Sequence, residues 1–120
     1  RSCAESGGKD IGVIGVAGGW EVYAGGCGGI ELKGAEKLVS VKTGCEVIEA
    51  VSAFLQHYRE DAHYGERTFK WVGRRGLASI RKEALEDAEA RKALCARIEE
   101  AAACAADPWG TETAAERKGA

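Results

Sequence analysis

Methionine is absent from all 120 residues, including position 1, although translation starts with this residue. We therefore expect a processed chain or a piece of a longer protein, and the abrupt start at Arg1-Ser2-Cys3 favours the piece. Long apolar runs are also missing, since none approaches the roughly 20 residues needed to span a bilayer. The N-terminus lacks the apolar core of a signal peptide. These absences predict a chain that neither crosses a membrane nor carries a secretory signal.

The sequence also lacks an excess of charge of one sign. A net charge of −2 gives no electrostatic case for binding nucleic acid or an anionic membrane. The five cysteines contain no Cys-x-x-Cys pair and match no zinc signature. Without a secretory context, a disulfide framework is not expected. We interpret Cys45, Cys95 and Cys104 as packing residues of helices, which leaves Cys3 and Cys27 in the glycine-rich opening.

The opening of the chain predicts a small β portion. Ile11–Val16 is a β-branched apolar run, and Trp20–Tyr23 alternates as a second strand, so the Ala-Gly-Gly between them indicates a hairpin. The glycines inside the first run imply close approach by another backbone or by a ligand. Gly25–Gly29 favours a sharp turn or a flat contact with a ligand. Its spacing matches neither a Rossmann fingerprint nor a phosphate loop.

Two short extended pieces, Ile30–Lys33 and Lys37–Lys42, precede a helical half that begins at Thr43. Thr43 and Glu46 form a capping box, in which each side chain is expected to satisfy an orphan amide of the first turn. The inward face of this helix is predicted to carry Val47, Ile48, Val51, Phe54, Leu55, Tyr58 and Ala62. The solvated face is predicted to carry Glu49, Gln56, Arg59 and Glu60.

Shorter helical segments complete the chain. Arg67–Arg75 predicts a short helix with Gly76 as its C-cap, and a further amphipathic stretch follows from Leu77 to Leu85. Asp87 is expected to cap a last, alanine-rich helix, which Asp107-Pro108 ends. The order of elements predicts an α+β fold, with a short β-hairpin or sheet portion at the N-terminus and a helical C-terminal cap.

Few side chains in this chain suggest chemistry by themselves. His57 and His63 are six residues apart and do not stack on one helical face, so we interpret both as solvated histidines. No serine has the context of a catalytic triad, and no pair of carboxylates is indicated. A lone cysteine such as Cys3 is more often incidental than a ligand, and only its neighbourhood changes that interpretation.

The neighbourhood of Cys3 matches one family over several stretches. The stretches in the opening are Cys3–Ser6, Lys9–Val16 and Gly19–Gly26. Those in the helical half are Ala53–Tyr64, Glu66–Thr68, Val72–Gly76, Arg91–Leu94 and Asp107–Trp109. In these stretches the chain resembles the C-terminal part of the sirohaem and 4Fe–4S domain of the assimilatory NAD(P)H nitrite reductase large subunit. The likeness covers nearly the whole chain to about residue 109.

The resemblance implies a role for four residues. In this family, cysteine thiolates hold the cluster, and the last two are spaced Cys-x-x-x-Cys. Cys3 matches the second of that pair, so the resemblance implies that its thiolate ligates the cluster and bridges it to the sirohaem iron. Gly25, Gly26 and Cys27 are expected to lie beside the macrocycle, although Cys27 stands where relatives are expected to have asparagine. No catalytic residue is expected, and the other cluster cysteines and the basic residues around the sirohaem are absent.

The family also implies a parent protein and an electron route from NAD(P)H through FAD and the cluster to sirohaem, where nitrite becomes ammonia. Residues 1–42 are then expected to end the sirohaem and 4Fe–4S domain, 43–106 to form a helical extension, and 107–120 a tail. The fragment is expected to be inactive alone, cytoplasmic, and a partner of the missing N-terminal part and of a small reductase subunit. Two alternatives remain: a fragment of a related sulfite reductase, and a small non-enzymatic helical interaction module.

Overall fold

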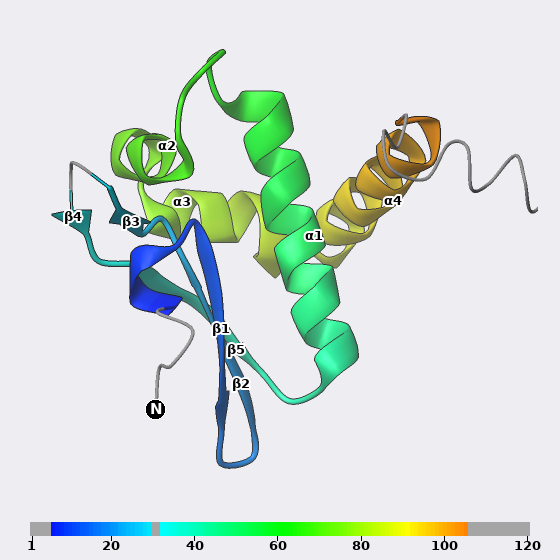
Figure 1. The fold of residues 1–120 in the computed structure, drawn as a ribbon. Helices are drawn as coiled ribbons and strands as arrows, with labels where there is room; N and C mark the ends of the chain where they lie inside the picture. The colour runs from blue at the N-terminus through cyan, green and yellow to red at the C-terminus, as the bar shows by residue number, and fades with distance from the viewer. Residues whose placement is uncertain (1–5, 30–31, 106–120) are drawn as a thin grey trace, which may run out of the picture.

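A computed structural model describes residues 6–29 and 32–105 of the chain, and it has the predicted α+β order (Figure 1). The β portion comprises η1 (Ser6–Gly8), β1 (Ile11–Val16), β2 (Gly19–Ala24), β3 (Cys27–Gly28), β4 (Leu32–Lys33) and β5 (Glu36–Val41). The helical portion comprises α1 (Gly44–Asp61), α2 (Thr68–Arg75), α3 (Leu77–Arg81), the π-helical turn η2 (Lys82–Glu86) and α4 (Ala88–Cys104). Among the described helices, none is long and apolar enough to cross a membrane.

The main sheet is antiparallel, with the strand order β1-β2-β5. The predicted hairpin is confirmed, and Val16 pairs with Gly19 across a two-residue turn in which Gly18 has a φ of 82°. Gly19 lies inside β2 rather than in the turn. A Cβ atom on Gly19 would lie 2.3 Å from the carbonyl oxygen of Val41, so the neighbouring strand β5 requires glycine there. The pairing of β5 with β2 was not predicted.

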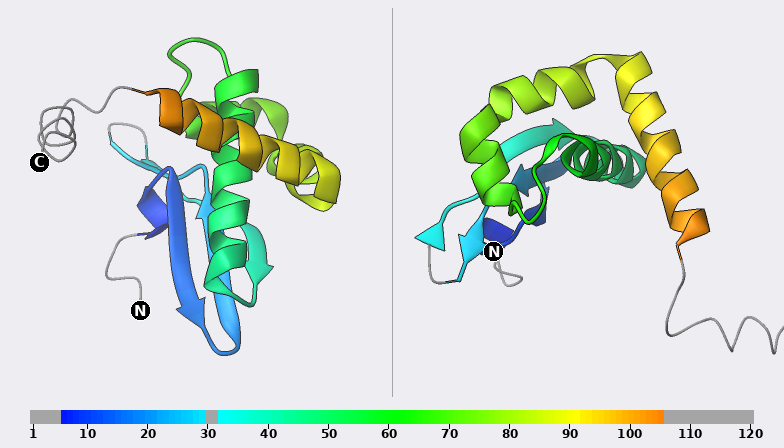
Figure 2. Two further views of the ribbon diagram at one scale, coloured as in Figure 1. Left: turned by 90° about the vertical axis from the view of Figure 1, so that its right-hand side faces the viewer. Right: turned by 90° about the horizontal axis from the view of Figure 1, so that it is seen from above.

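One face of the sheet carries the core. Val22, Ala24 and Leu38 are buried against the helices, where they meet the fully buried Phe54 of α1. Seen from above, α2, α3, η2 and α4 follow an arc, and α1 lies inside it between α4 and the sheet (Figure 2). Because a single cluster of apolar side chains joins the sheet to the helices, the two portions are stabilised together.

The start of α1 is close to the prediction. Thr43 is the N-cap, and its hydroxyl oxygen accepts from the Glu46 amide at 3.2 Å. The other half of the capping box differs, because the Glu46 carboxylate accepts from the Thr43 hydroxyl at 3.1 Å. The caps of the later helices are confirmed: Asp87 accepts from two amides at the start of α4, and Gly76, with a φ of 82°, ends α2.

The predicted faces of α1 are wrong at two positions. Ile48 was predicted to face inward, yet it is 69% exposed, whereas Gln56, predicted to be solvated, is only 7% exposed. The reason is α4, which packs along α1 and brings Arg97 into a salt bridge with Glu60. The Gln56 amide then donates to Glu60 at 2.6 Å, which satisfies a buried polar group.

His57 was predicted to be solvated, and this is also wrong. Its Nε2 lies 2.8 Å from Glu83 Oε2, and its ring meets the indole of Trp71 edge-on with centroids 5.4 Å apart. Trp71 is itself fully buried and donates from Nε1 to Asp61 at 2.7 Å. His63, in contrast, is exposed as expected.

Candidate cofactor-binding site

The structure describes three of the four residues for which a cofactor role is predicted. Cys3 lies outside the described residues. Gly25, Gly26 and Cys27 are all buried, and Cys27 opens the short strand β3, where it pairs with Lys33 of β4. The Cys27 residue is 8% exposed. The glycine-rich loop is therefore a packed part of the fold that has a buried thiol at its centre.

A second backbone segment, Gly7–Asp10, packs against this loop. The amide of Gly25 donates to the carbonyl of Asp10 and that of Gly26 to the carbonyl of Lys9, each at 3.0 Å. The amide of Ala35 donates to the carbonyl of Gly7 at 2.9 Å. Gly26 belongs to the run that was predicted to turn sharply or to lie flat against a ligand, and its close contact in the structure is with backbone. A Cβ atom there would lie 2.7 Å from the Gly7 carbonyl oxygen.

The close approach makes Gly26 sensitive to the smallest possible substitution. We expect Gly26→Ala to lower the free energy of unfolding by about 2 kcal/mol, because the two backbone segments must move apart to admit the methyl group. Gly7→Ala is the control, since a Cβ atom on Gly7 meets nothing within 4 Å, and a shift within about 0.5 kcal/mol is expected. Urea unfolding followed by circular dichroism measures both. Equal effects of the two substitutions would contradict this view of the loop.

The carboxylate of Asp10 joins this segment to the start of α2. The Nη2 atom of Arg67 lies 3.1 and 3.2 Å from the two Asp10 carboxylate oxygens, and the hydroxyl of the buried Thr68 donates to Oδ1. Burial acts to raise the pKa of Asp10, but the hydrogen bonds from Thr68 and Arg67 outweigh it and lower the pKa below its ordinary value. Asp10 is therefore an anion at neutral pH. We call these three residues the Asp10 clamp.

A hollow of about 380 Å³ opens between these elements. Its lining comprises Gly8, Lys9, Asp10, Cys27, Gly28, Gly29 and Arg67. Three of the seven lining residues are glycines, which leave part of this wall without side chains. Within the described ranges, no group of three or more His, Cys, Asp and Glu side chains could hold a metal ion. The described residues therefore supply a hollow with one buried thiol and no complete set of ligands for a metal ion.

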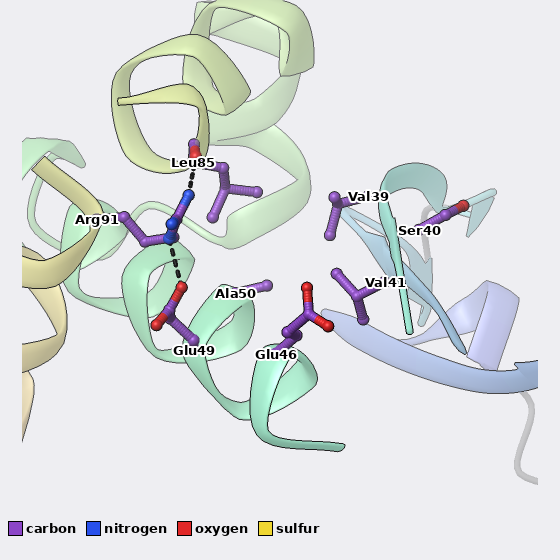
Figure 3. Close-up of a pocket in the computed structure, with 8 residues that line it drawn as sticks. All are labelled: Val39, Ser40, Val41, Glu46, Glu49, Ala50, Leu85 and Arg91. Atoms are coloured by element: carbon purple, nitrogen blue, oxygen red, sulfur yellow. Dashed lines mark hydrogen bonds and ion pairs between the residues drawn. The ribbon is translucent and has the colours of Figure 1, made fainter. Parts of the chain in front are cut away.

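A separate hollow of about 230 Å³ lies between β5, α1, η2 and α4 (Figure 3). Arg91 projects into it and forms an ion pair with Glu49, while its Nη1 donates to the carbonyl of Leu85 at 2.6 Å. Val39 and Ala50 contribute apolar walls. None of the described residues with a predicted cofactor role lines this hollow, and its Arg91 and Glu49 are paired with each other, so we interpret it as a packing feature.

The Asp10 clamp was missed in the sequence. The sequence places Asp10, Arg67 and Thr68 only in separate stretches that resemble the family, with no sign that they meet. Fifty-seven residues separate Asp10 from Arg67, and no local pattern pairs them. The available signal was the resemblance, because both ends of the clamp fall in stretches that match the family.

Comparison with known proteins agrees with the family suggested by these residues. The profile of the nitrite and sulphite reductase 4Fe-4S domain matches residues 1–92. A Bacillus subtilis NAD(P)H nitrite reductase is 49% identical over 109 residues, which are 91% of this chain and 13% of that protein. The large subunit of the Klebsiella oxytoca NAD(P)H nitrite reductase is 35% identical over 72% of this chain and 9% of its own length.

A more distant relative is an assimilatory nitrate reductase electron transfer subunit of Bacillus subtilis, 28% identical over 71% of this chain and 11% of that protein. No solved structure gives a significant match. The chain spans only 13% or less of the length of these three relatives. Because the family profile covers more than half of the chain and the Bacillus subtilis reductase matches most of it, the chain belongs to the nitrite and sulphite reductase 4Fe-4S domain family.

Proposed function

We propose that the chain is part of an assimilatory NAD(P)H nitrite reductase, in which nitrite is reduced to ammonia by six electrons at a sirohaem coupled to a 4Fe–4S cluster. The observation that carries this proposal is the 49% identity with a Bacillus subtilis NAD(P)H nitrite reductase over 91% of the chain. The parent protein also carries FAD and acts in the cytoplasm, with a small reductase subunit as its partner. The chain alone is inactive, because a single thiolate does not hold a four-iron cluster.

Within this proposal, Cys3 supplies one cluster thiolate, and Gly25, Gly26 and Cys27 belong to the wall beside the cofactor. Covalent connectivity supports this, since Cys3 is five residues from Gly8, a lining residue of the hollow. Five residues span at most about 18 Å. When bound, a sirohaem and cluster supply electron storage and transfer, and the protein supplies orientation and electrostatics. The chain's own contribution is a glycine-containing wall and an Asp10 carboxylate that is paired with Arg67 and hydrogen-bonded by Thr68.

The proposal is tested with the purified parent reductase, supplied with NAD(P)H and either nitrite or sulfite. We expect ammonium to form from nitrite, with a kcat/KM for nitrite at least about tenfold above that for sulfite, a difference of 1.4 kcal/mol in transition-state stabilisation. Equal or better turnover of sulfite would favour a sulfite reductase, a function that the family also includes. A parent without sirohaem or cluster absorbance would contradict both functions and leave a non-enzymatic module.

A further inference from the structure

Strand β5 lies at one end of the sheet order β1-β2-β5, so its outer edge is not paired within that sheet. A strand edge presents amide and carbonyl groups that can pair with a strand of another chain, and natural proteins protect such edges with bulges, charges or a covering element. The middle of β5 is apolar and β-branched, with Leu38, Val39 and Val41. Its outer edge is therefore a surface on which unwanted strand pairing has to be prevented.

The pairing of β5 with β2 contains a bulge at Leu38. The partners in β5 jump from Val39 to Lys37 between successive residues of β2, so Leu38 has no partner there. A bulge leaves its extra residue unpaired in the ladder. The Leu38 side chain is only 1% exposed and belongs to the core. A backbone carbonyl at such a buried position needs a hydrogen-bond donor from another element.

Arg81, the last residue of α3, supplies the donors at this bulge. Its Nε donates to the carbonyl of Leu38 at 2.6 Å, and its Nη2 donates to the carbonyl of Lys37 at 2.9 Å. The planar guanidinium presents its N–H groups as a fixed fork, so one side chain satisfies two acceptors. Two buried residues of α3, Leu77 and Ile80, anchor this helix in the core. Because β2 occupies the inner edge of β5, the fork of Arg81 lies on the outer edge.

We propose that Arg81 protects the outer edge of β5, by occupying two of its carbonyls so that a second copy of the chain cannot add its own β5 there. A second copy is the partner that must be excluded, because the charges around β5 are self-complementary. Antiparallel pairing centred on Val39 would place Glu36 of each copy opposite Lys42 of the other. Both side chains are exposed, and opposite charges that face each other stabilise a strand pair. This inference goes beyond the proposed function, because it involves no cofactor.

The test uses the full-length parent protein, in which Arg81→Met keeps an unbranched apolar stem and removes the fork. We expect Arg81→Met to lower the dissociation constant for self-association by at least about 10-fold relative to wild type. Sedimentation velocity over a series of protein concentrations measures this constant. The matched control is Arg97→Met, because Arg97 is also a helix arginine but donates to the carboxylate of Glu60 in α1. The control should associate no more than wild type.

Two further measurements separate strand pairing from general destabilisation. When two β5 strands pair, their backbone amides gain hydrogen bonds, so hydrogen exchange at residues 39–41 should slow as the concentration of Arg81→Met rises. Destabilisation alone would make the same amides exchange faster at every concentration. Adding Glu36→Lys to Arg81→Met places like charges opposite each other in the strand pair, so the dissociation constant should rise again.

Arg81→Lys is a milder variant, since an ammonium keeps the charge but loses the fork. It should associate more tightly than wild type and less tightly than Arg81→Met, and it decides alone if Arg81→Met does not fold. Wild-type self-association of the deciding variant would overturn the proposal, as would equal association of Arg97→Met. Association that comes with faster exchange at residues 39–41, or that Glu36→Lys does not weaken, would also overturn it, because the contact would not be a pair of β5 strands.

Discussion

The Cys3→Ser variant of the parent reductase is expected to lose both the sirohaem absorbance and the paramagnetic signal of the cluster. A serine hydroxyl is a hard, weakly acidic oxygen group that binds iron–sulfur clusters poorly, whereas a thiolate is the soft ligand they favour. Loss of an orienting group outside the coordination shell already costs 10-fold or more in metal binding. Loss of the ligand itself should therefore lower the iron content per chain by more than about 10-fold.

The matched controls are Cys45 and Cys104, which were predicted to pack in their helices but are exposed. Cys45 lies in the first turn of α1 and Cys104 at the end of α4, and neither lines the hollow beside Cys27. Cys45→Ser and Cys104→Ser should keep both spectra and the full iron content. A Cys3→Ser protein that retained both signals would refute the ligand role, and loss of the signals in the controls would show a general effect of removing thiols.

The secondary structure was largely predictable, because its signals are local. The β-branched run and the Gly18 turn encode the hairpin, while Thr43, Gly76 and Asp87 mark helix ends through hydrogen bonds within a few residues. The predictions that failed, those for the two faces of α1, depend on which helix covers which face. Ile48 and Gln56 both follow the apolar and polar pattern of an isolated helix, but the packing of α4 on α1 buries Gln56, and Ile48 stays exposed.

The candidate site was predictable only in part, for the same reason. A glycine-rich loop with a cysteine is visible in the sequence, and so is its resemblance to the family. Two contacts at the site join distant parts of the chain. Gly26 lies against the Gly7 carbonyl, and Asp10 binds residues at the start of α2. They depend on the sheet and α2 sharing one core, which hydrophobic periodicity does not specify.

Trp71 is the side chain through which the core and the site depend on each other. Its fully buried ring meets Phe54, His57 and Tyr58 edge-on, with ring centroids 5.4 to 5.5 Å away, and Nε1 donates to Asp61. All four partners belong to α1. Trp71 therefore fixes α2 to the longest described helix, and the first residue of α2, Thr68, binds Asp10.

Trp71→Ala is expected to lower the free energy of unfolding by about 3 to 5 kcal/mol, because it removes the ring and leaves a cavity that α1 and α2 fill only partly. Trp71→Phe keeps most of the ring contacts and loses the hydrogen bond to Asp61, so a loss of about 1 to 2 kcal/mol is expected. Trp20→Ala, at a position that is 39% exposed, is the control and should cost less than Trp71→Ala, because part of its ring already faces solvent.

Urea unfolding of the three variants gives these differences, and hydrogen exchange at the amides of Gly25 and Gly26 reports the site. Because these amides bond to the Gly7–Asp10 segment, Trp71→Ala should accelerate their exchange, while Trp20→Ala should not. If Trp71→Ala and Trp20→Ala unfolded at the same urea concentration, α2 would be held by contacts other than those of Trp71. If Trp71→Ala is destabilised but hydrogen exchange at the Gly25 and Gly26 amides is unchanged, the glycine-rich loop does not depend on the packing of Trp71.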